Sequence, residues 1–113
     1  MIQVYHNPRC TKSRECLAFL EDSGKEFEII KYLEKVPTKK ELLSIVRKLK
    51  IKPIELIRKN EPVWKENFND KNLSDAGIIA AMLEYPILIE RPIVVNGEKA
   101  AIARPIENAM AII

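Results

Sequence analysis

The chain has 113 residues, of which 47% are hydrophobic and 31% charged, and its formal net charge is +3 at neutral pH. This length is typical of one domain, and the interspersed charges of both signs exclude an intrinsically disordered chain. The sequence has no long basic run and no stretch of about 18 apolar residues, so we expect neither nucleic-acid binding nor a membrane span.

The first third of the chain predicts a strand, a helix and a second strand. Residues 2–6 alternate between apolar and polar side chains before an Asn-Pro pair, which is typical of a short strand ending in a turn. From about Thr11 the apolar side chains follow a helical spacing, and Gly24 marks the expected end of this helix. Residues 27–32 (FEIIKY) predict the second strand. This order favours a right-handed parallel unit.

The middle of the chain predicts several helices. Thr38 and Glu41 have the spacing of a capping box, in which each side chain binds a free amide group at the helix start. The expected apolar stripe of that helix consists of Leu42, Leu43, Val46 and Leu49. A short helix is expected near Pro53, residues 60–72 are polar and predict an irregular segment, and another helix is expected over residues 74–84.

The last third returns to strands. Residues 87–89 and 93–95 are apolar and β-branched, as in buried strands. An Asn-Gly pair follows, which indicates a two-residue hairpin, so residues 99–103 are expected to return as the antiparallel partner. Pro105 suits the first turn of a closing helix. The buried side of that helix is expected to contain Ile106, Ala109, Met110 and Ile113.

These elements predict an α/β fold with a mixed sheet flanked by helices. Their order is β-α-β, a helical insertion at about residues 37–85, and then β-β-α. By analogy, this is the order of the thioredoxin and glutaredoxin fold with an inserted helical subdomain. We expect the chain, residues 1–113, to form a single domain of this kind.

Cys10 is the main candidate for chemistry. It lies directly before the first predicted helical turn, where free amide groups and the helix dipole favour a thiolate, with a pKa of roughly 3.5–7.5 in such places. Basic neighbours (Arg9, Lys12 and Arg14) add positive charge, and the same amide groups can bind an oxyanion. A free cysteine is more often a small buried hydrophobic residue, and position alone leaves both roles open.

The other residues near Cys10 exclude several familiar sites. A tyrosine-phosphatase loop needs an arginine where this chain has Cys16, and a dithiol oxidoreductase needs a cysteine where it has Ser13. Together, His6, Cys10 and Cys16 are too few and too unsuitably spaced for a metal site. Cys16 points in a different direction from Cys10 on the predicted helix, which favours a buried structural role. His6, the only histidine, either assists the thiolate or caps the turn.

Several separated segments resemble the glutaredoxin-linked arsenate reductases, in order and along nearly the whole chain. These segments are HNPRCTKSRECL (6–17), IIKYLEKVPTKKEL (29–42), LIRKNEP (56–62), YPILIERPIVV (85–95) and ARPIENA (103–109). The resemblance implies a thioredoxin-like fold with a helical insertion, which agrees with the predicted element order.

The resemblance also implies residue roles. Cys10 matches the catalytic cysteine, and His6 matches a histidine that assists it. The matches to the arginines that bind the oxyanion are Arg58, Arg91 and Arg104. Pro92 matches the cis-proline that faces the active cysteine. We add Ser13 and Arg14, in the first turn of the predicted helix, as candidate substrate-binding residues.

The implied activity is the reduction of arsenate to arsenite through a covalent Cys10 adduct, which glutathione and a glutaredoxin resolve. It needs no metal and no tightly bound cofactor, with glutathione as co-substrate. The N-terminus does not read as a secretory signal, so we expect a cytoplasmic protein, and we expect a monomer. Two alternatives are a glutathione-dependent thiol transferase and an Spx-type regulator that binds RNA polymerase, although Spx-type proteins usually carry Cys-x-x-Cys where this chain has Ser13.

Overall fold

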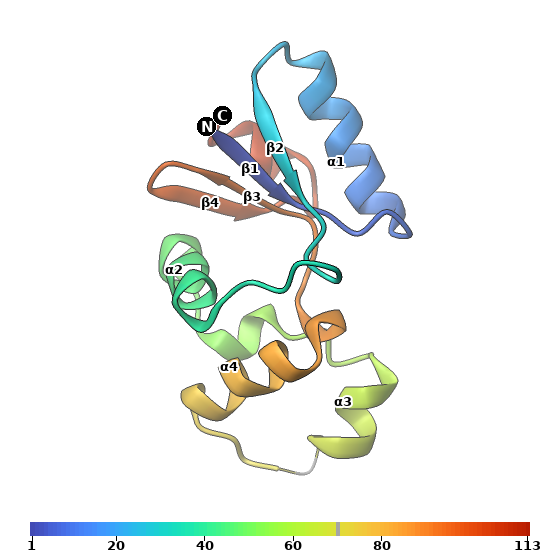
Figure 1. Cartoon of the computed structure of the whole chain (residues 1–113), viewed down its shortest axis with the longest axis vertical. Coiled ribbons are helices and arrows are strands. Elements are labelled where there is room, and N and C mark those ends of the chain that lie inside the picture. Colours follow the sequence, from blue (N-terminus) through green and yellow to red (C-terminus); the bar gives the residue numbers. More distant parts are fainter. Residues whose placement is uncertain (70) are drawn as a thin grey trace. The chain divides into compact units, whose positions relative to one another are not determined.

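The chain forms two compact units, which a computed structural model describes over residues 1–69 and 71–113. One unit combines Met1–Lys35 with Arg91–Ile113, and the other is the inserted segment Val36–Glu90. The first contains the sheet, whereas the second is helical (Figure 1).

The first unit is built on a four-stranded mixed sheet with the order β2-β1-β3-β4. The strands are β1 (Ile2–Tyr5), β2 (Phe27–Ile30), β3 (Ile93–Asn96) and β4 (Lys99–Ile102). β1 is parallel to β2 and antiparallel to β3, and β4 is antiparallel to β3. The predicted mixed sheet is therefore confirmed.

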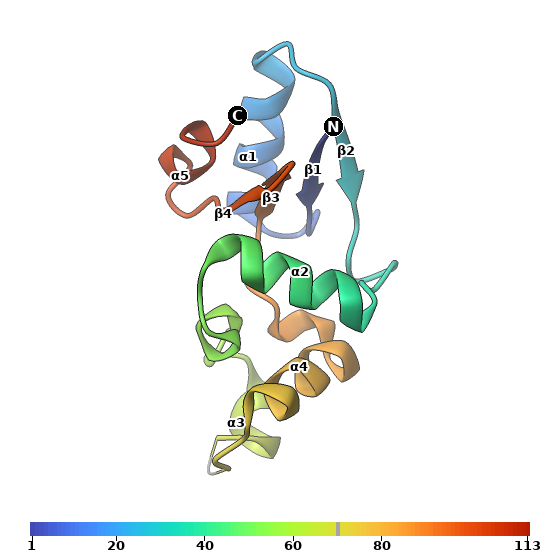
Figure 2. The ribbon, with the colours of Figure 1, turned by 90° about the vertical axis from the view of Figure 1, so that its left-hand side faces the viewer.

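Two helices, α1 (Thr11–Asp22) and α5 (Glu107–Met110), cover one face of this sheet (Figure 2). Their side chains join one buried cluster with the strands, which contains Ile2, Val4, Cys16, Leu20, Val94, Ala103 and Ala109. α1 ends where the sequence predicts, because Gly24 adopts a positive φ of 74° that other residues rarely reach.

The hairpin between β3 and β4 is present but lies one residue later than the Asn-Gly signal implies. Asn96 pairs with Lys99, so the two-residue loop consists of Gly97 and Glu98. Gly97 has a φ of 63°, as the first loop position of a type II′ turn requires.

The closing helix is shorter than expected, and one of its predicted buried residues is wrong. α5 spans only Glu107–Met110, with Ala109 buried and Met110 47% exposed. The chain ends after this single turn with Ile112 and Ile113 packed against the core cluster. The Asn96 side-chain amide donates to the carbonyl of Ile112 at 2.7 Å and holds this end.

The inserted unit contains α2 (Lys39–Leu49), α3 (Pro62–Asn67) and α4 (Asp75–Glu84), with two 3-10 helices, η1 (Pro53–Leu56) and η2 (Pro86–Leu88). The predicted capping box is confirmed at the start of α2. The Thr38 amide donates to Glu41 Oε1 at 2.9 Å, and the Glu41 amide donates to Thr38 Oγ1 at 3.1 Å. The helix expected over residues 74–84 is also confirmed, with Ser74 as its cap.

The buried stripe of α2 differs from the predicted one. Leu42 and Val46 are buried as expected, but Leu43 is 45% exposed and Ile45 is buried in its place. Ile45 and Leu42 lie three positions apart and share one side of the helix, whereas Leu43 is turned away from it.

The predicted irregular segment over residues 60–72 is wrong in part, because α3 occupies Pro62–Asn67. Pro62 begins this helix at a position where no amide donor is needed. The buried Trp64 packs on Phe68, with ring centroids 5.5 Å apart, and this aromatic contact stabilises a segment that reads as polar. The part of the prediction that falls on Asp70 lies outside the described residues.

The strand expected over residues 87–89 is also wrong. Pro86–Leu88 forms the 3-10 helix η2, because Pro86 fixes a helical φ and lacks an amide for a ladder. Only Ile89 makes an isolated antiparallel bridge, with Ile57. Along residues 1–69 and 71–113, no helix has both the length and the apolar character that crossing a membrane requires.

Candidate active site

A tight turn before α1 places Cys10 at the helix start. The Cys10 amide donates to the Asn7 carbonyl at 3.0 Å, and the Arg9 amide donates to Asn7 Oδ1 at 3.0 Å. Cys10 has an extended backbone (φ −94°, ψ 124°), and its carbonyl accepts the first helical hydrogen bond, from Arg14. Cys10 therefore occupies the N-cap position, where its sulfur lies near free amide groups.

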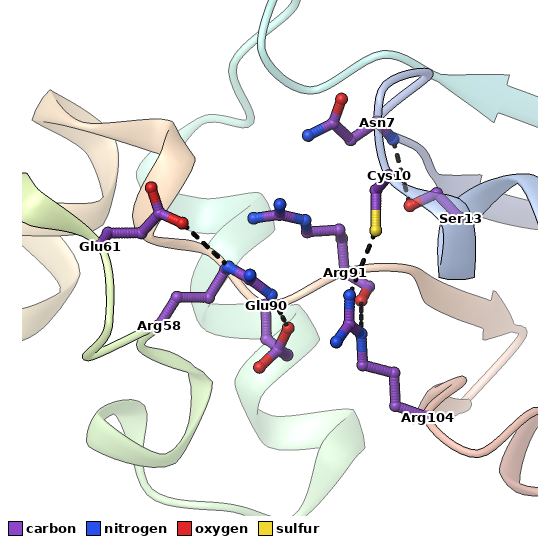
Figure 3. A network of polar contacts seen from close by, with 8 residues as sticks. All are labelled: Asn7, Cys10, Ser13, Arg58, Glu61, Glu90, Arg91 and Arg104. Atoms are coloured by element: carbon purple, nitrogen blue, oxygen red, sulfur yellow. Dashed lines mark hydrogen bonds and ion pairs between the residues drawn. The ribbon is translucent and has the colours of Figure 1, made fainter.

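Ser13, in the first turn of α1, is hydrogen-bonded to the sulfur of Cys10 through both its backbone amide and its hydroxyl. The hydroxyl also accepts a hydrogen bond from the Asn7 amide at 3.4 Å (Figure 3). The contacts of Ser13 lower the pKa of the Cys10 thiol, because a hydrogen bond to sulfur favours its ionised form. Ser13 is fully buried. Substrate binding by Ser13 stays a prediction.

Two arginines from the second half of the chain complete the surroundings of the sulfur. The guanidinium of Arg104 donates to Cys10 Sγ at 3.1 Å through one terminal nitrogen, and its Nε donates to the carbonyl of Arg91 at 2.8 Å (Figure 3). The side chain of Arg91 is also hydrogen-bonded to the sulfur. The Arg91–Pro92 peptide bond is cis, as the resemblance implies, and the Arg104–Pro105 bond, for which we predicted nothing, is cis as well.

These contacts make Cys10 an acidic thiol. Burial of the sulfur, which is in a residue only 8% exposed, raises its pKa, but hydrogen bonds from Ser13, Arg91 and Arg104 outweigh this effect. The result is a pKa of about 6, against an ordinary value of 9.0. Most Cys10 is therefore ionised at neutral pH, and a thiolate is the form of cysteine that acts as a nucleophile.

Cys16 has the opposite environment. It is fully buried in the core cluster against the sheet, and this burial raises the pKa of its thiol to about 11. It is a free thiol, like Cys10. The buried structural role predicted for Cys16 agrees with this environment.

Residues 5–112 match the ArsC family. This chain belongs to the ArsC family. Over 112 residues it is 44% identical to a protein of Haemophilus influenzae named "Arsenate reductase", covering 97% of both chains. It is also 43% identical over 116 residues to "Uncharacterized protein YfgD" of Escherichia coli, covering 99% of this chain and 96% of YfgD.

A solved structure gives the same family and the same fold. The structure described as "Arsenate reductase from Vibrio cholerae" is 44% identical, covers 99% of this chain and 97% of its own, and has a TM-score of 0.93. The thioredoxin-like fold with a helical insertion is therefore confirmed for this member of the ArsC family.

His6 of this ArsC family chain is buried at the end of β1, where its amide donates to the carbonyl of Ile30 at 2.8 Å. Burial and the positive charges of Lys31 and Arg14 lower the pKa of its imidazole, although a hydrogen bond at the Ser13 backbone acts in the opposite direction. His6 is therefore mainly neutral at pH 7 and brings no positive charge to the thiolate. Its assisting role stays a prediction.

Arg14 lies on the exposed side of the first turn of α1. Its guanidinium donates to the Pro8 carbonyl at 3.0 Å and to Thr11 Oγ1 at 3.2 Å. These bonds join the Cys10 turn to the helix from outside. Substrate binding by Arg14 stays a prediction.

Arg58 belongs to the helical unit and is held by two carboxylates there (Figure 3). One terminal nitrogen lies 2.6 Å from Glu90 Oε1, and Nε lies 3.4 Å from Glu61 Oε2. Burial alone would lower the pKa of Arg58, but the two carboxylates raise it, so its charge is secure. Oxyanion binding by Arg58 stays a prediction. The unit that contains the sheet holds the sulfur and its hydrogen-bonded neighbours, namely Cys10, Ser13, Arg91 and Arg104.

The sequence analysis missed one residue of this site. Asn7 is buried and joins three parts of the turn, through its carbonyl, its side-chain oxygen and its amide. Its position before Pro8 was a signal for a turn, but nothing in the sequence connects its amide with the Ser13 hydroxyl. Within the described part of the chain, no group of three or more His, Cys, Asp or Glu side chains could hold a metal ion.

Proposed function

We propose that this protein is an arsenate reductase in which Cys10 is the nucleophile and glutathione with a glutaredoxin completes the reaction. One observation carries the proposal: a cysteine with a pKa of about 6 whose sulfur accepts a hydrogen bond from Arg104 at 3.1 Å, in a chain of the ArsC family. The name of the Haemophilus influenzae relative supports arsenate as the substrate.

The proposed first step is attack of the Cys10 thiolate on arsenic. A sulfur–arsenic bond forms, and an arsenate oxygen leaves as water after it takes up protons. Arg91 and Arg104 already donate to the anionic sulfur, and guanidinium groups match the oxygens of a tetrahedral oxyanion. They would stabilise the negative charge that passes from sulfur to the oxyanion.

The second step needs a thiol from outside the chain. Reduction of arsenate to arsenite takes two electrons, which two thiols supply when they join as a disulfide. Cys10 supplies one sulfur, but Ser13 stands at the position of a resolving thiol, and Cys16 is fully buried. A glutathione thiol is therefore the proposed second partner. Its sulfur bonds to the sulfur of Cys10 as the sulfur–arsenic bond breaks, and the electron pair of that bond stays on arsenic, which leaves as arsenite. Glutaredoxin would then reduce the mixed disulfide between Cys10 and glutathione.

The charge around Cys10 favours arsenate over the thiol transferase alternative. The sulfur of Cys10 is hydrogen-bonded to the side chains of two arginines, Arg91 and Arg104. Guanidinium groups match the oxygens of a tetrahedral oxyanion, whereas the sulfur atoms of a disulfide carry no negative charge for them to bind.

The test is an arsenate reduction assay with glutathione and glutaredoxin on three proteins: wild type, Cys10→Ser and Cys16→Ala. We expect wild type and Cys16→Ala to produce arsenite and Cys10→Ser to produce none, because serine supplies no thiolate. Activity in Cys10→Ser would refute the nucleophile. An inactive wild type that reduces a glutathione mixed disulfide would support the thiol transferase instead.

A further inference from the structure

Arg104 lies in the loop between β4 and α5, in neither a strand nor a helix. Its guanidinium contacts both the sulfur of Cys10 and the carbonyl of Arg91. A long side chain can hold two such contacts only if the backbone that carries it is fixed, because arginine otherwise has many rotamers. The contacts of Arg104 therefore depend on the groups that fix its backbone.

The side chain of Asn108 supplies two of these bonds. Its amide nitrogen donates to the carbonyl of Ile102 at 3.1 Å and to the carbonyl of Arg104 at 3.3 Å. The same Ile102 carbonyl accepts the Arg104 amide at 2.8 Å. Asn108 therefore binds the backbone at Arg104 itself and at the last residue of β4, two positions before it.

The described side-chain contacts of Asn108 all serve the backbone near Arg104. Asn108 is exposed, so its side chain does not contribute to the core. Its two described acceptors are the backbone carbonyls of Ile102 and Arg104. These two bonds use both protons of the side-chain NH₂ group.

We propose that Asn108 is a positioning residue, which fixes the loop around Arg104 so that its guanidinium stays on the sulfur of Cys10. This deepens the proposed function, because it concerns the same sulfur, but it is carried by the geometry of the loop and needs no particular substrate. Asn108 does not touch the reacting atoms and acts only through Arg104.

The test measures the pKa of Cys10 by the ultraviolet absorbance of its thiolate, in Asn108→Ala and in Asn108→Leu, which keeps a side chain of similar size, lacks both donors and adds no charge. A hydrogen bond to a charged group changes a pKa by roughly one unit, so partial loss of the Arg104 contact should raise the Cys10 pKa by about half a unit. The matched control is Asn67→Ala, since Asn67 is exposed and also donates to a backbone carbonyl, that of Val63 at 3.0 Å. This control should leave the pKa of Cys10 unchanged.

A double-mutant cycle separates positioning from a general structural effect. Arg104→Gln alone should raise the pKa of Cys10, and adding Asn108→Ala to it should raise the pKa no further. A pKa that equals the wild-type value in both Asn108 variants would overturn the proposal. A shift that persists undiminished in the Arg104→Gln background would overturn it as well.

The positioning role of Asn108 and the arsenate reductase activity are tested by different measurements. The pKa measurement needs no arsenate, so a positive cycle would stand even if the protein proved inactive on arsenate. If the wild type reduces arsenate and the Asn108 variants keep the wild-type pKa of Cys10, the positioning role falls and the arsenate reductase remains.

Discussion

Cys10 and Cys16 are both buried free thiols, yet their pKa values are moved in opposite directions, to about 6 and about 11. Burial raises both values. Among the described residues, hydrogen-bond donors lower the pKa of Cys10 but not that of Cys16. The donors at Cys10 come from the first turn of α1 and from two arginines far along the chain. Burial alone therefore keeps Cys16 protonated, whereas the donors around the sulfur of Cys10 outweigh its burial.

Ser13 should be one of the groups that keep Cys10 ionised. Ser13→Ala removes the hydroxyl that donates to sulfur, so we expect the pKa of Cys10 to rise by about one unit, since bonds to charged groups are strong. Activity should fall at pH values near 6 and return toward wild type as the pH rises. Ser23→Ala is the matched control, because Ser23 lies at the other end of α1 and its hydroxyl donates to Leu20. An unchanged pH profile in Ser13→Ala would contradict the assignment.

Arg91 should bind the oxyanion in a way that lysine cannot reproduce. Arg91→Lys keeps the positive charge but loses the planar fork, so we expect the KM for arsenate to rise roughly tenfold, with a smaller change in kcat. Steady-state kinetics measure both constants. Kinetics equal to those of the wild type would remove Arg91 from the substrate site.

The sequence could predict the position of the reactive cysteine but not the hydrogen-bond partners of its sulfur. Cys10 follows a strand and a turn and precedes a helix, and local pattern is enough to place such a residue at an N-cap. The bond from Arg104 to the sulfur depends on two segments that are remote in sequence, and the resemblance implied only that Arg104 binds the oxyanion. The contact of Ser13 depends on a side-chain rotamer inside the turn, which no spacing predicts.

The helical elements show where local signals are sufficient. α2 begins at its predicted capping box, because both partners lie within one turn of the chain. α3 was missed because the polar residues around it hid a local aromatic pair, Trp64 and Phe68, which lie four positions apart. Phe68 also packs on Tyr85, a contact between remote segments that no local pattern predicts. Residues 87–89 were assigned to a strand for their β-branched side chains, and Pro86 overrode that preference.

The capping box should contribute measurably to stability. Thr38→Ala removes the hydroxyl that accepts the Glu41 amide, so we expect the free energy of unfolding to fall by about 1 kcal/mol in urea. Thr38→Ser keeps the hydroxyl and should lose much less. Equal stability of Thr38→Ala and the wild type would show that the cap is not formed in solution.

For the whole molecule, the order of the elements was predictable and the site was only partly so. Strand and helix periodicities gave β-α-β, an insertion and β-β-α, and the resemblance supplied the fold that the Vibrio cholerae structure confirms. The sheet unit assembles the site from both ends of the chain, since β1 lies between β2 and β3. That pairing places Cys10, which follows β1, beside Arg91 and Arg104, which flank the β3–β4 hairpin.

The most direct test of this account is a thiolate titration of the whole native protein, followed by ultraviolet absorbance in wild type and Cys10→Ser. Because the pKa of Cys10 is lowered, its ionised form should appear as the pH rises through about 6. The rise in absorbance at this pH should correspond to one thiolate in the wild type and should be absent in Cys10→Ser. The second thiol, Cys16, should ionise only near pH 11. A wild-type protein whose first step comes near the ordinary cysteine value, or a step at about 6 that survives in Cys10→Ser, would contradict the central claim.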